Sequence, residues 1–365
     1  MEPLALHEFH QLARAAFFAL EGMEAVRDYG DAMAEYRALR ETVAVLDLSF
    51  RGRLCVLGAD RKRFLNGQVT NNVKDLKTGE GCYAALVTAK GKMESDLNIY
   101  SLENELLLDF EPGLSIKVPA RLEKYIIAED AQIVDVAPHY GLLSVQGPRA
   151  EAVLESLFPV RPQKPFNVVR IEDAELGEIY VANQPRIGTS GYDLFVPAAH
   201  TRSAVEKVLT AARVIGGRLC GWTALETARI EAGIPRFGLD MDGTNLPPEA
   251  GLDDKAVSYS KGCYIGQEVI ARIRTYGQVA KSLRGLRLPD DLPALPARGD
   301  KLFFNGKEAG YITSAVASPA LRGNIALGYV RREANQIGME LQLEAAKKTH
   351  SVRIVGLPFD LSTSA

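Results

Sequence analysis

The sequence predicts an α+β fold followed by a small antiparallel β-barrel. Between residue 45 and about residue 275, strand-like and helix-like segments follow one another without regular alternation, which favours α+β over a doubly wound parallel sheet. A proline-rich linker at residues 288–296 interrupts regular structure, and the chain from 300 to 356 then holds only short strand candidates, as a small barrel does. We therefore divide the chain into an N-terminal helical segment (1–44), a core (45–280) and a C-terminal barrel domain (281–365).

The N-terminal segment contains two helix candidates. Residues 4–20 place apolar side chains near one face at helical spacing, and residues 31–42 predict a second helix with Asp31 as its N-cap. We expect both helices to pack on the main body, with a partner-binding helix as the alternative.

The core and the barrel hold short segments rich in β-branched or aromatic residues, separated by turn residues. The strand candidates are Arg53–Leu57, Tyr83–Thr88, Leu97–Tyr100, Glu105–Phe110, Gln132–Val136, Leu142–Gln146, Lys301–Phe304, Ala326–Val330, Glu340–Leu343 and Ser351–Val355. Helix candidates fall at 60–66, 115–126, 148–157, 201–213 and 222–232, the third with Pro148 at its first position.

Composition excludes several classes of protein. The net charge of −3 gives no strong overall attraction to nucleic acid or to an anionic membrane, and no run of about 18 apolar residues predicts a membrane span. The four cysteines lie far apart and the five histidines lack metal-ligand spacing, which argues against a structural zinc site or a disulfide framework. The acidic N-terminus is unlike a targeting peptide, so we expect a cytoplasmic protein. We also expect it to be a monomer.

The most informative segment is an octapeptide that holds one cysteine between glycines. It reads Lys261, Gly262, Cys263, Tyr264, Ile265, Gly266, Gln267 and Glu268. Glycines allow a tight turn that brings Cys263 close to another molecule, and the nearby lysine favours the reactive thiolate. The alternative is that Cys263 is a small buried apolar side chain. Any metal bound through Cys263 needs further ligands from a partner or a small molecule.

Several motifs resemble those of the folate-binding aminomethyltransferase-like superfamily, to which the glycine cleavage T-protein belongs. They are Val45–Ser49, Phe64–Asn66, Thr70-Asn71, the R-x-E-x-G signature at Arg229–Gly233, Leu246–Leu252, Gly310–Ser314 and Ile325–Val330. The octapeptide is similar to the K-G-C-Y-x-G-Q-E signature of the YgfZ-type branch, whose members support iron–sulfur enzymes. The resemblance spans residues from about 40 to about 335 and implies two α+β subdomains and a barrel around a folate-sized opening.

The resemblance also implies site residues. Asp96 falls where transferases of the superfamily have an aspartate that faces the reactive nitrogen of the folate, although it could also cap a turn. Asp193 lies near the pterin-binding glutamate of the family, in a shorter loop and with Asp where Glu is usual. Arg229 matches the site arginine, with a structural ion pair as the alternative, and Tyr83 either walls the ring or belongs to the core.

Three functions remain open on this basis. The first is a tetrahydrofolate-binding accessory protein in which Cys263 helps to assemble or repair iron–sulfur enzymes, including tRNA-modifying ones, by sharing a transient cluster with an assembly or client protein. The second is a folate-dependent aminomethyltransferase or related one-carbon transferase, in which Asp96 exchanges a proton with the folate nitrogen. The third is a binding module for a partner. None of them requires direct contact with nucleic acid or a membrane.

Overall fold

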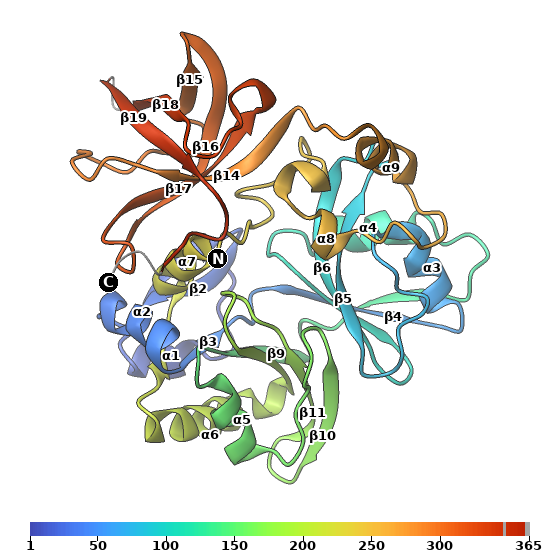
Figure 1. The fold of residues 1–365 in the computed structure, drawn as a ribbon. Helices are drawn as coiled ribbons and strands as arrows, with labels where there is room; N and C mark the ends of the chain where they lie inside the picture. Colours follow the sequence, from blue (N-terminus) through green and yellow to red (C-terminus); the bar gives the residue numbers. More distant parts are fainter. Residues whose placement is uncertain (346–347, 362–365) are drawn as a thin grey trace. The chain divides into compact units, whose positions relative to one another are not determined.

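The computed structural model describes residues 1–345 and 348–361, which form two compact units (Figure 1). Unit 1 comprises residues 1–86, 95–228 and 260–264. Unit 2 comprises residues 87–94, 229–259 and the chain from residue 265 onward. The division into residues 1–44, 45–280 and 281–365 stays a prediction.

The N-terminal segment is only partly helical. Its elements are α1 (His7–Leu12), β1 (Ala16–Leu20), β2 (Met23–Asp28) and α2 (Ala32–Glu41). The helix predicted over residues 4–20 is therefore wrong beyond Leu12, because β1 and β2 form an antiparallel hairpin. Its turn residues Glu21 and Gly22 both have positive φ angles, which match the twist of paired strands. The second helix is confirmed, and the Asp31 carboxylate accepts a hydrogen bond from the Ala34 amide at 2.9 Å.

A six-stranded sheet carries the apolar core of one half of unit 1. Its strand order is β10-β11-β12-β9-β3-β13, antiparallel except where β13 pairs with β3. The strands are β3 (Ala44–Asp47), β9 (Tyr140–Gln146), β10 (Val168–Asp173), β11 (Gly177–Asn183), β12 (Gly191–Pro197) and β13 (Arg218–Leu219). Helices α5 (Ala150–Leu157) and α6 (Thr201–Val214) pack against this sheet and close its core.

A five-stranded sheet in the order β5-β6-β7-β4-β8 positions most of the candidate site. Its strands are β4 (Gly52–Leu57), β5 (Gly81–Val87), β6 (Met93–Ser101), β7 (Leu106–Phe110) and β8 (Gln132–Asp135), with helices α3 (Arg61–Gln68) and α4 (Lys117–Glu123). In the antiparallel ladder, Asn98 of β6 lies opposite Asp109 of β7, and Asp109 lies opposite Arg53 of β4. Polar side chains thus lie in rows across neighbouring strands.

The strands of unit 2 close into a six-stranded antiparallel barrel with an apolar interior. They are β14 (Lys281–Arg287), β15 (Lys301–Phe304), β16 (Lys307–Ser318), β17 (Gly323–Arg331), β18 (Glu340–Ala345) and β19 (Lys348–Val355). The helices that precede the barrel are α7 (Trp222–Glu231), α8 (Asp253–Ala256) and α9 (Gln267–Tyr276), together with a short 3₁₀ helix at Pro247–Ala250.

The α+β core and the C-terminal antiparallel barrel are confirmed. Every strand and helix predicted between residues 53 and 232 has a counterpart, but Pro148 is not the first helical residue, because α5 begins at Ala150 with Arg149 as its N-cap. The octapeptide ends inside a helix, since α9 begins at Gln267. Within the described residues, no helix has the length and apolar character to cross a membrane.

The N-cap of α2 yields a direct test of this local structure. Asp31→Ala removes the acceptor for the Ala34 amide, and we expect the free energy of unfolding to fall by about 1 kcal/mol. Urea denaturation followed by circular dichroism measures the loss. The control is Asp31→Asn, which keeps a capping oxygen and should leave stability nearly unchanged. Equal losses in the two variants would contradict the cap.

Candidate functional site

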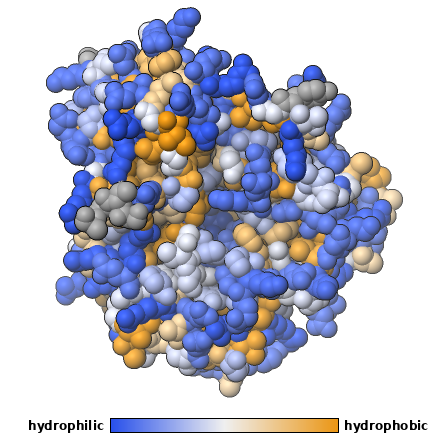
Figure 2. Space-filling view, in the orientation of Figure 1, coloured by the Kyte–Doolittle hydropathy of each residue, from blue (hydrophilic) through white to orange (hydrophobic). Residues whose placement is uncertain are grey.

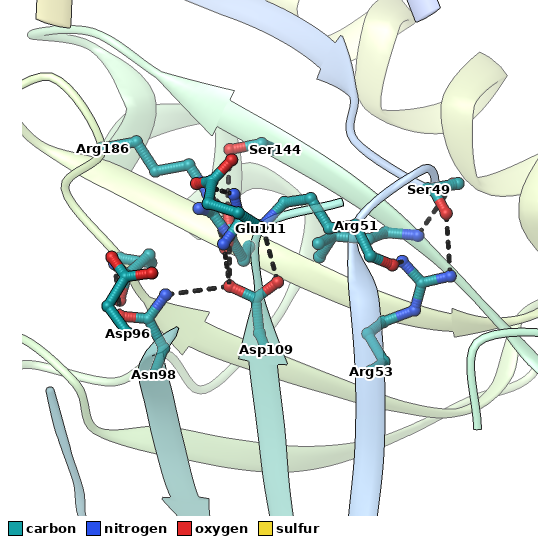
Figure 3. A network of polar contacts seen from close by, with 12 residues as sticks. Ser49, Arg51, Arg53, Asp96, Asn98, Asp109, Glu111, Ser144 and Arg186 are labelled. Carbon is teal, nitrogen blue, oxygen red and sulfur yellow. Dashed lines mark hydrogen bonds and ion pairs between the residues drawn. The ribbon is translucent and has the colours of Figure 1, made fainter. Parts of the chain in front are cut away.

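The candidate site in unit 1 is a row of charged side chains on the face of β4, β6 and β7 (Figure 3). At its centre is Asp109, which is fully buried. Its carboxylate accepts hydrogen bonds from Arg51 Nε at 2.7 Å, Arg186 Nη2 at 2.9 Å and Asn98 Nδ2 at 2.9 Å. The two guanidinium groups hold the pKa of Asp109 well below its usual range, against the effect of burial. Asp109 is therefore a permanent anion.

Asp96 lies at the end of this row and differs from Asp109 in its partners. Its Oδ2 accepts a hydrogen bond from the Tyr83 hydroxyl at 2.8 Å, and its buried Oδ1 has no donor among the described residues. Burial, followed by the charge of Glu111, raises the pKa of Asp96 to about 6. A carboxyl with this pKa gains and loses a proton near neutral pH, as a general acid or base must.

Tyr83 connects Asp96 to the aromatic surroundings of the site. Its ring stacks on Phe166 with centroids 6.4 Å apart and planes inclined by 12°. Burial, with Asp96 nearby, raises the pKa of the Tyr83 hydroxyl, which therefore stays a hydrogen-bond donor. The structure thus brings together Tyr83 and Asp96, two of the residues that the sequence singled out.

Asp193, the residue expected near the pterin, already has hydrogen-bond partners within the chain. It is fully buried, and its carboxylate accepts hydrogen bonds from Arg186 Nε at 3.0 and 3.1 Å and from the Ser144 hydroxyl at 2.7 Å. Arg186 bridges Asp193 and Asp109. A ligand that uses both oxygens of Asp193 must therefore displace Arg186. The ligand role of Asp193 stays a prediction.

Arg229, in unit 2, also has partners within the chain. The side chain is 2% exposed, and its guanidinium pairs with the buried Asp240 and donates to the Ser314 hydroxyl at 3.0 Å and the Ile234 carbonyl at 3.1 Å. Arg229 is thus part of a buried ion pair whose partner is Asp240. Because Asp240 would remain buried without its counter-charge, Arg229→Ala should cost about 3–5 kcal/mol of stability. A folate contact by Arg229 stays a prediction.

The octapeptide begins with an anchored lysine and an exposed cysteine. Lys261 Nζ donates to the carbonyl oxygens of Asn66, Val69 and Asn71 at 2.5, 2.7 and 2.7 Å, at the end of α3. Burial lowers the pKa of Lys261 to about 7. Since the ammonium is directed at these carbonyls, its expected role beside the thiolate gives way to an anchoring role. Cys263 itself is exposed, which excludes the buried apolar alternative.

The remaining residues of the octapeptide shape the path from the loop into α9. Tyr264 is buried, and its ring lies 4.9 Å from Lys261 Nζ. Gly266 is the N-cap of α9 with a φ of +84°, and a Cβ there would meet the Thr88 carbonyl oxygen at 2.5 Å. The segment therefore needs glycine at position 266 for both space and backbone conformation. Glu268 lies in the first turn of α9, where a carboxylate suits the helix dipole.

Sequence reasoning missed three residues of the network, namely Arg51, Glu111 and Arg186. Arg51 pairs with both Asp109 and Glu111. A signal for two of them was present, because alternate residues of a strand lie on one face. The patterns Arg51-Gly52-Arg53 and Asp109-Phe110-Glu111 therefore place charges on a common face. Arg186 lies between β11 and β12, and nothing in the local sequence indicates its partners.

A cavity of 490 Å³ lies within unit 2 and contains none of the predicted site residues. Its lining includes Glu249, Asp253 and Tyr259, which precede the octapeptide in the sequence, and Arg274 and Arg284, which follow it. The part of the chain that the structure describes contains no cluster of three His, Cys, Asp or Glu side chains suited to a metal ion.

Comparison with known proteins identifies the family. The GCVT N-terminal domain family matches residues 6–261, and the glycine cleavage T-protein C-terminal barrel domain family matches residues 281–360. An aminomethyltransferase of Shouchella clausii is 27% identical over 356 residues, covering 97% of this chain and 96% of that protein. An aminomethyltransferase of Bacillus subtilis is 29% identical over 341 residues, covering 93% of each.

A solved structure agrees with these matches. The glycine cleavage system aminomethyltransferase T of Bartonella henselae superposes with a TM-score of 0.89 at 25% identity, covering 99% of this chain and 98% of that one. The relatives carry the name aminomethyltransferase, and the YgfZ-type assignment within the superfamily stays a proposal. The two domain matches together span nearly the whole chain. The chain belongs to the glycine cleavage T-protein family.

Proposed function

We propose that this protein binds tetrahydrofolate or a one-carbon derivative at the Asp96 face of unit 1 and acts as a folate-dependent one-carbon transferase of the aminomethyltransferase class. The observation that carries the proposal is the state of Asp96. One oxygen is fixed by the Tyr83 hydroxyl, the other has no donor among the described residues, and the pKa is about 6. The names of the relatives from Shouchella clausii and Bacillus subtilis support the same reaction class.

Asp96 suits this task because its pKa of about 6 lies near neutral pH. Proton transfer is fastest when the pKa of the acid or base lies near the working pH. A carboxyl oxygen without an internal donor is also costly to bury, and a ligand N–H or a protonated ligand nitrogen would satisfy it. A reduced folate carries a nitrogen of this kind. Asp96 thus orients the ligand and moves its proton.

Recognition of the pterin ring in this protein requires a further step. Arg186 already pairs with Asp193, so Asp193 accepts pterin N–H groups only after Arg186 has moved. Displacement is costly because Asp193 is fully buried and would lose its counter-charge. We infer that Asp96 contributes more to ligand recognition here than Asp193 does.

A second candidate is the accessory function in iron–sulfur enzyme maintenance, which Cys263 favours. Its side chain is exposed, two residues after the anchored Lys261 and directly before the buried Tyr264. An exposed thiolate is a suitable ligand for a cluster shared transiently with an assembly or client protein. This candidate keeps the folate site and adds the thiol. A monomer in the cytoplasm remains part of the proposal.

The transferase proposal is tested with an aminomethylated lipoyl carrier and tetrahydrofolate as substrates. The wild-type protein should form methylene-tetrahydrofolate, and Asp96→Asn should lower kcat about 10²-fold or more because the amide cannot exchange the proton. The control is Asp75→Asn, an exposed aspartate of unit 1. Absence of turnover by the wild-type protein, with tetrahydrofolate binding intact by calorimetry, would exclude the transferase and leave the accessory function.

The accessory candidate is tested by complementation of a deletion strain that lacks this protein. Cys263→Ser should fold normally, because the thiol is exposed, and should fail to restore iron–sulfur enzyme activity. The control is Cys55→Ala, which alters a buried cysteine whose pKa is raised by burial and which is therefore inert. Full restoration by Cys263→Ser would remove the thiol from the function.

The proton affinity of Asp96 also predicts a dependence of stability on pH. Its pKa is raised from 3.8 to about 6 in the folded protein, so the folded state binds the proton more tightly than the unfolded state. The wild-type protein should therefore lose stability as pH rises from about 4 to about 6, with no further loss from this group above that range. Asp96→Asn should escape up to about 2–3 kcal/mol of this loss. Urea denaturation of both proteins at pH 4.5 and 7.5 measures it, and parallel pH profiles would contradict it.

A further inference from the structure

Two carboxyl side chains, those of Asp96 and Glu111, lie near each other at the same end of the neighbouring strands β6 and β7. The last pair of the register is Asn98 with Asp109; Asp96 lies two residues before Asn98 in β6, and Glu111 lies two residues after Asp109, just beyond the end of β7. Figure 3 shows both carboxyls at the same end of the two strands, beyond the Asn98–Asp109 pair. Like charges directly opposite each other destabilise an antiparallel pair. The juxtaposition is therefore a cost to the fold that needs another explanation.

Arg51 keeps Glu111 in place and favours its charged form. Arg53 of β4 lies opposite Asp109 of β7. Two residues further on, Arg51 and Glu111 lie just outside these strands and form an ion pair. The Arg51 guanidinium contacts Glu111 and also donates to Asp109 through Nε at 2.7 Å and Nη2 at 3.1 Å. A guanidinium fixed at three points cannot turn away from Glu111 without leaving the buried Asp109. The negative charge therefore stays beside Asp96.

The groups around Asp96 act in opposite directions on its proton. Tyr83 of β5 donates a hydrogen bond to the carboxylate, and the positive charge of Arg51 also favours that form. Burial and the charge of Glu111 favour the protonated form, and their combined effect is the larger one, so the pKa of Asp96 is raised. Arg186 is engaged by Asp109 and Asp193, so it supplies Asp96 with no hydrogen bond in the structure. Glu111 is thus the charged group that opposes ionisation of Asp96.

We propose that Glu111 is a positioning residue whose negative charge favours the protonated form of Asp96, so that the two carboxyls act as a pair that delivers one proton to a basic nitrogen of the bound ligand. In that step the O–H bond of Asp96 breaks, the nitrogen lone pair takes the proton, and Asp96 becomes a carboxylate. No electrons are exchanged, and the reverse step restores the acid. The identity of the ligand rests on the proposed function, whereas the proton on Asp96 does not.

The proposal is tested on the full-length, ligand-free protein by nuclear magnetic resonance. The protein is labelled with ¹³C at the aspartate carboxyls, and the signal of Asp96 is assigned from its loss in Asp96→Asn. Glu111→Gln removes the charge with little change of shape, and the titration midpoint of Asp96 should fall by about one unit or more. The matched control is Glu103→Gln in the turn between β6 and β7, where the side chain is 75% exposed, and it should leave the midpoint unchanged.

An unchanged midpoint in Glu111→Gln would overturn the proposal. A measurement on the wild-type protein needs no variant to fold: with ¹³C-labelled glutamate carboxyls, the Glu111 signal, assigned through bonds, should move at the midpoint of Asp96, and its failure to do so would equally overturn the proposal. A purely structural Glu111 would alter stability without moving either midpoint. Calorimetry with tetrahydrofolate then separates the two proposals, because absent binding with a shifted midpoint refutes the proposed function and leaves the carboxyl pair.

Discussion

The N-terminal unit depends on the burial of one carboxylate, Asp109, between two arginines. Arg51 precedes β4 of the five-stranded sheet, and Arg186 comes from the connection between β11 and β12 of the six-stranded sheet, so the Asp109 carboxylate ties the two sheets together. Removal of one partner from such a buried cluster costs about 3–5 kcal/mol, because the remaining charge is left uncompensated. Arg51 also binds Glu111, and Arg186 also binds Asp193. The contacts of the two arginines with Asp109 therefore help to position these two carboxyls.

This network leaves one carboxyl in a different state from the others. Asp109, Glu111 and Asp193 each contact a guanidinium group. Asp96 accepts a hydrogen bond from a neutral hydroxyl, that of Tyr83, and lies at the same end of the strands as Glu111. Burial also raises the pKa of Asp193, but that carboxylate is held by Arg186, whereas one oxygen of Asp96 has no donor among the described residues. The features that stabilise the fold and the feature that suits it to proton transfer are parts of one arrangement.

The elements were predictable where the signal is local. Alternating apolar residues and turn residues locate β4 to β9, and the Asp31 cap locates α2. The helix predicted from the apolar spacing over residues 4–20 is wrong beyond Leu12. The Glu21-Gly22 turn, in which both residues have positive φ, folds β1 onto β2 instead. In the site, Asp96 and Tyr83 were found by resemblance, whereas Glu111 and Arg186 depend on strand register and on pairing between sheets. Those are properties of the tertiary structure that no short segment encodes.

A path of hydrogen bonds connects the octapeptide to Asp96 within unit 1. Lys261 Nζ donates to the Asn71 carbonyl at 2.7 Å, Asn71 Nδ2 donates to the Tyr83 carbonyl at 2.8 Å, and the Tyr83 hydroxyl donates to Asp96 at 2.8 Å. Lys261 therefore fixes the peptide that supports the strand of Tyr83, rather than serving the thiol of Cys263. Because the anchor of the loop and the orientation of the Asp96 carboxyl share this path, the transferase candidate and the accessory candidate both require this part of the fold to be intact. What separates them is the chemistry of Cys263, whose exposed thiol plays no part in the path.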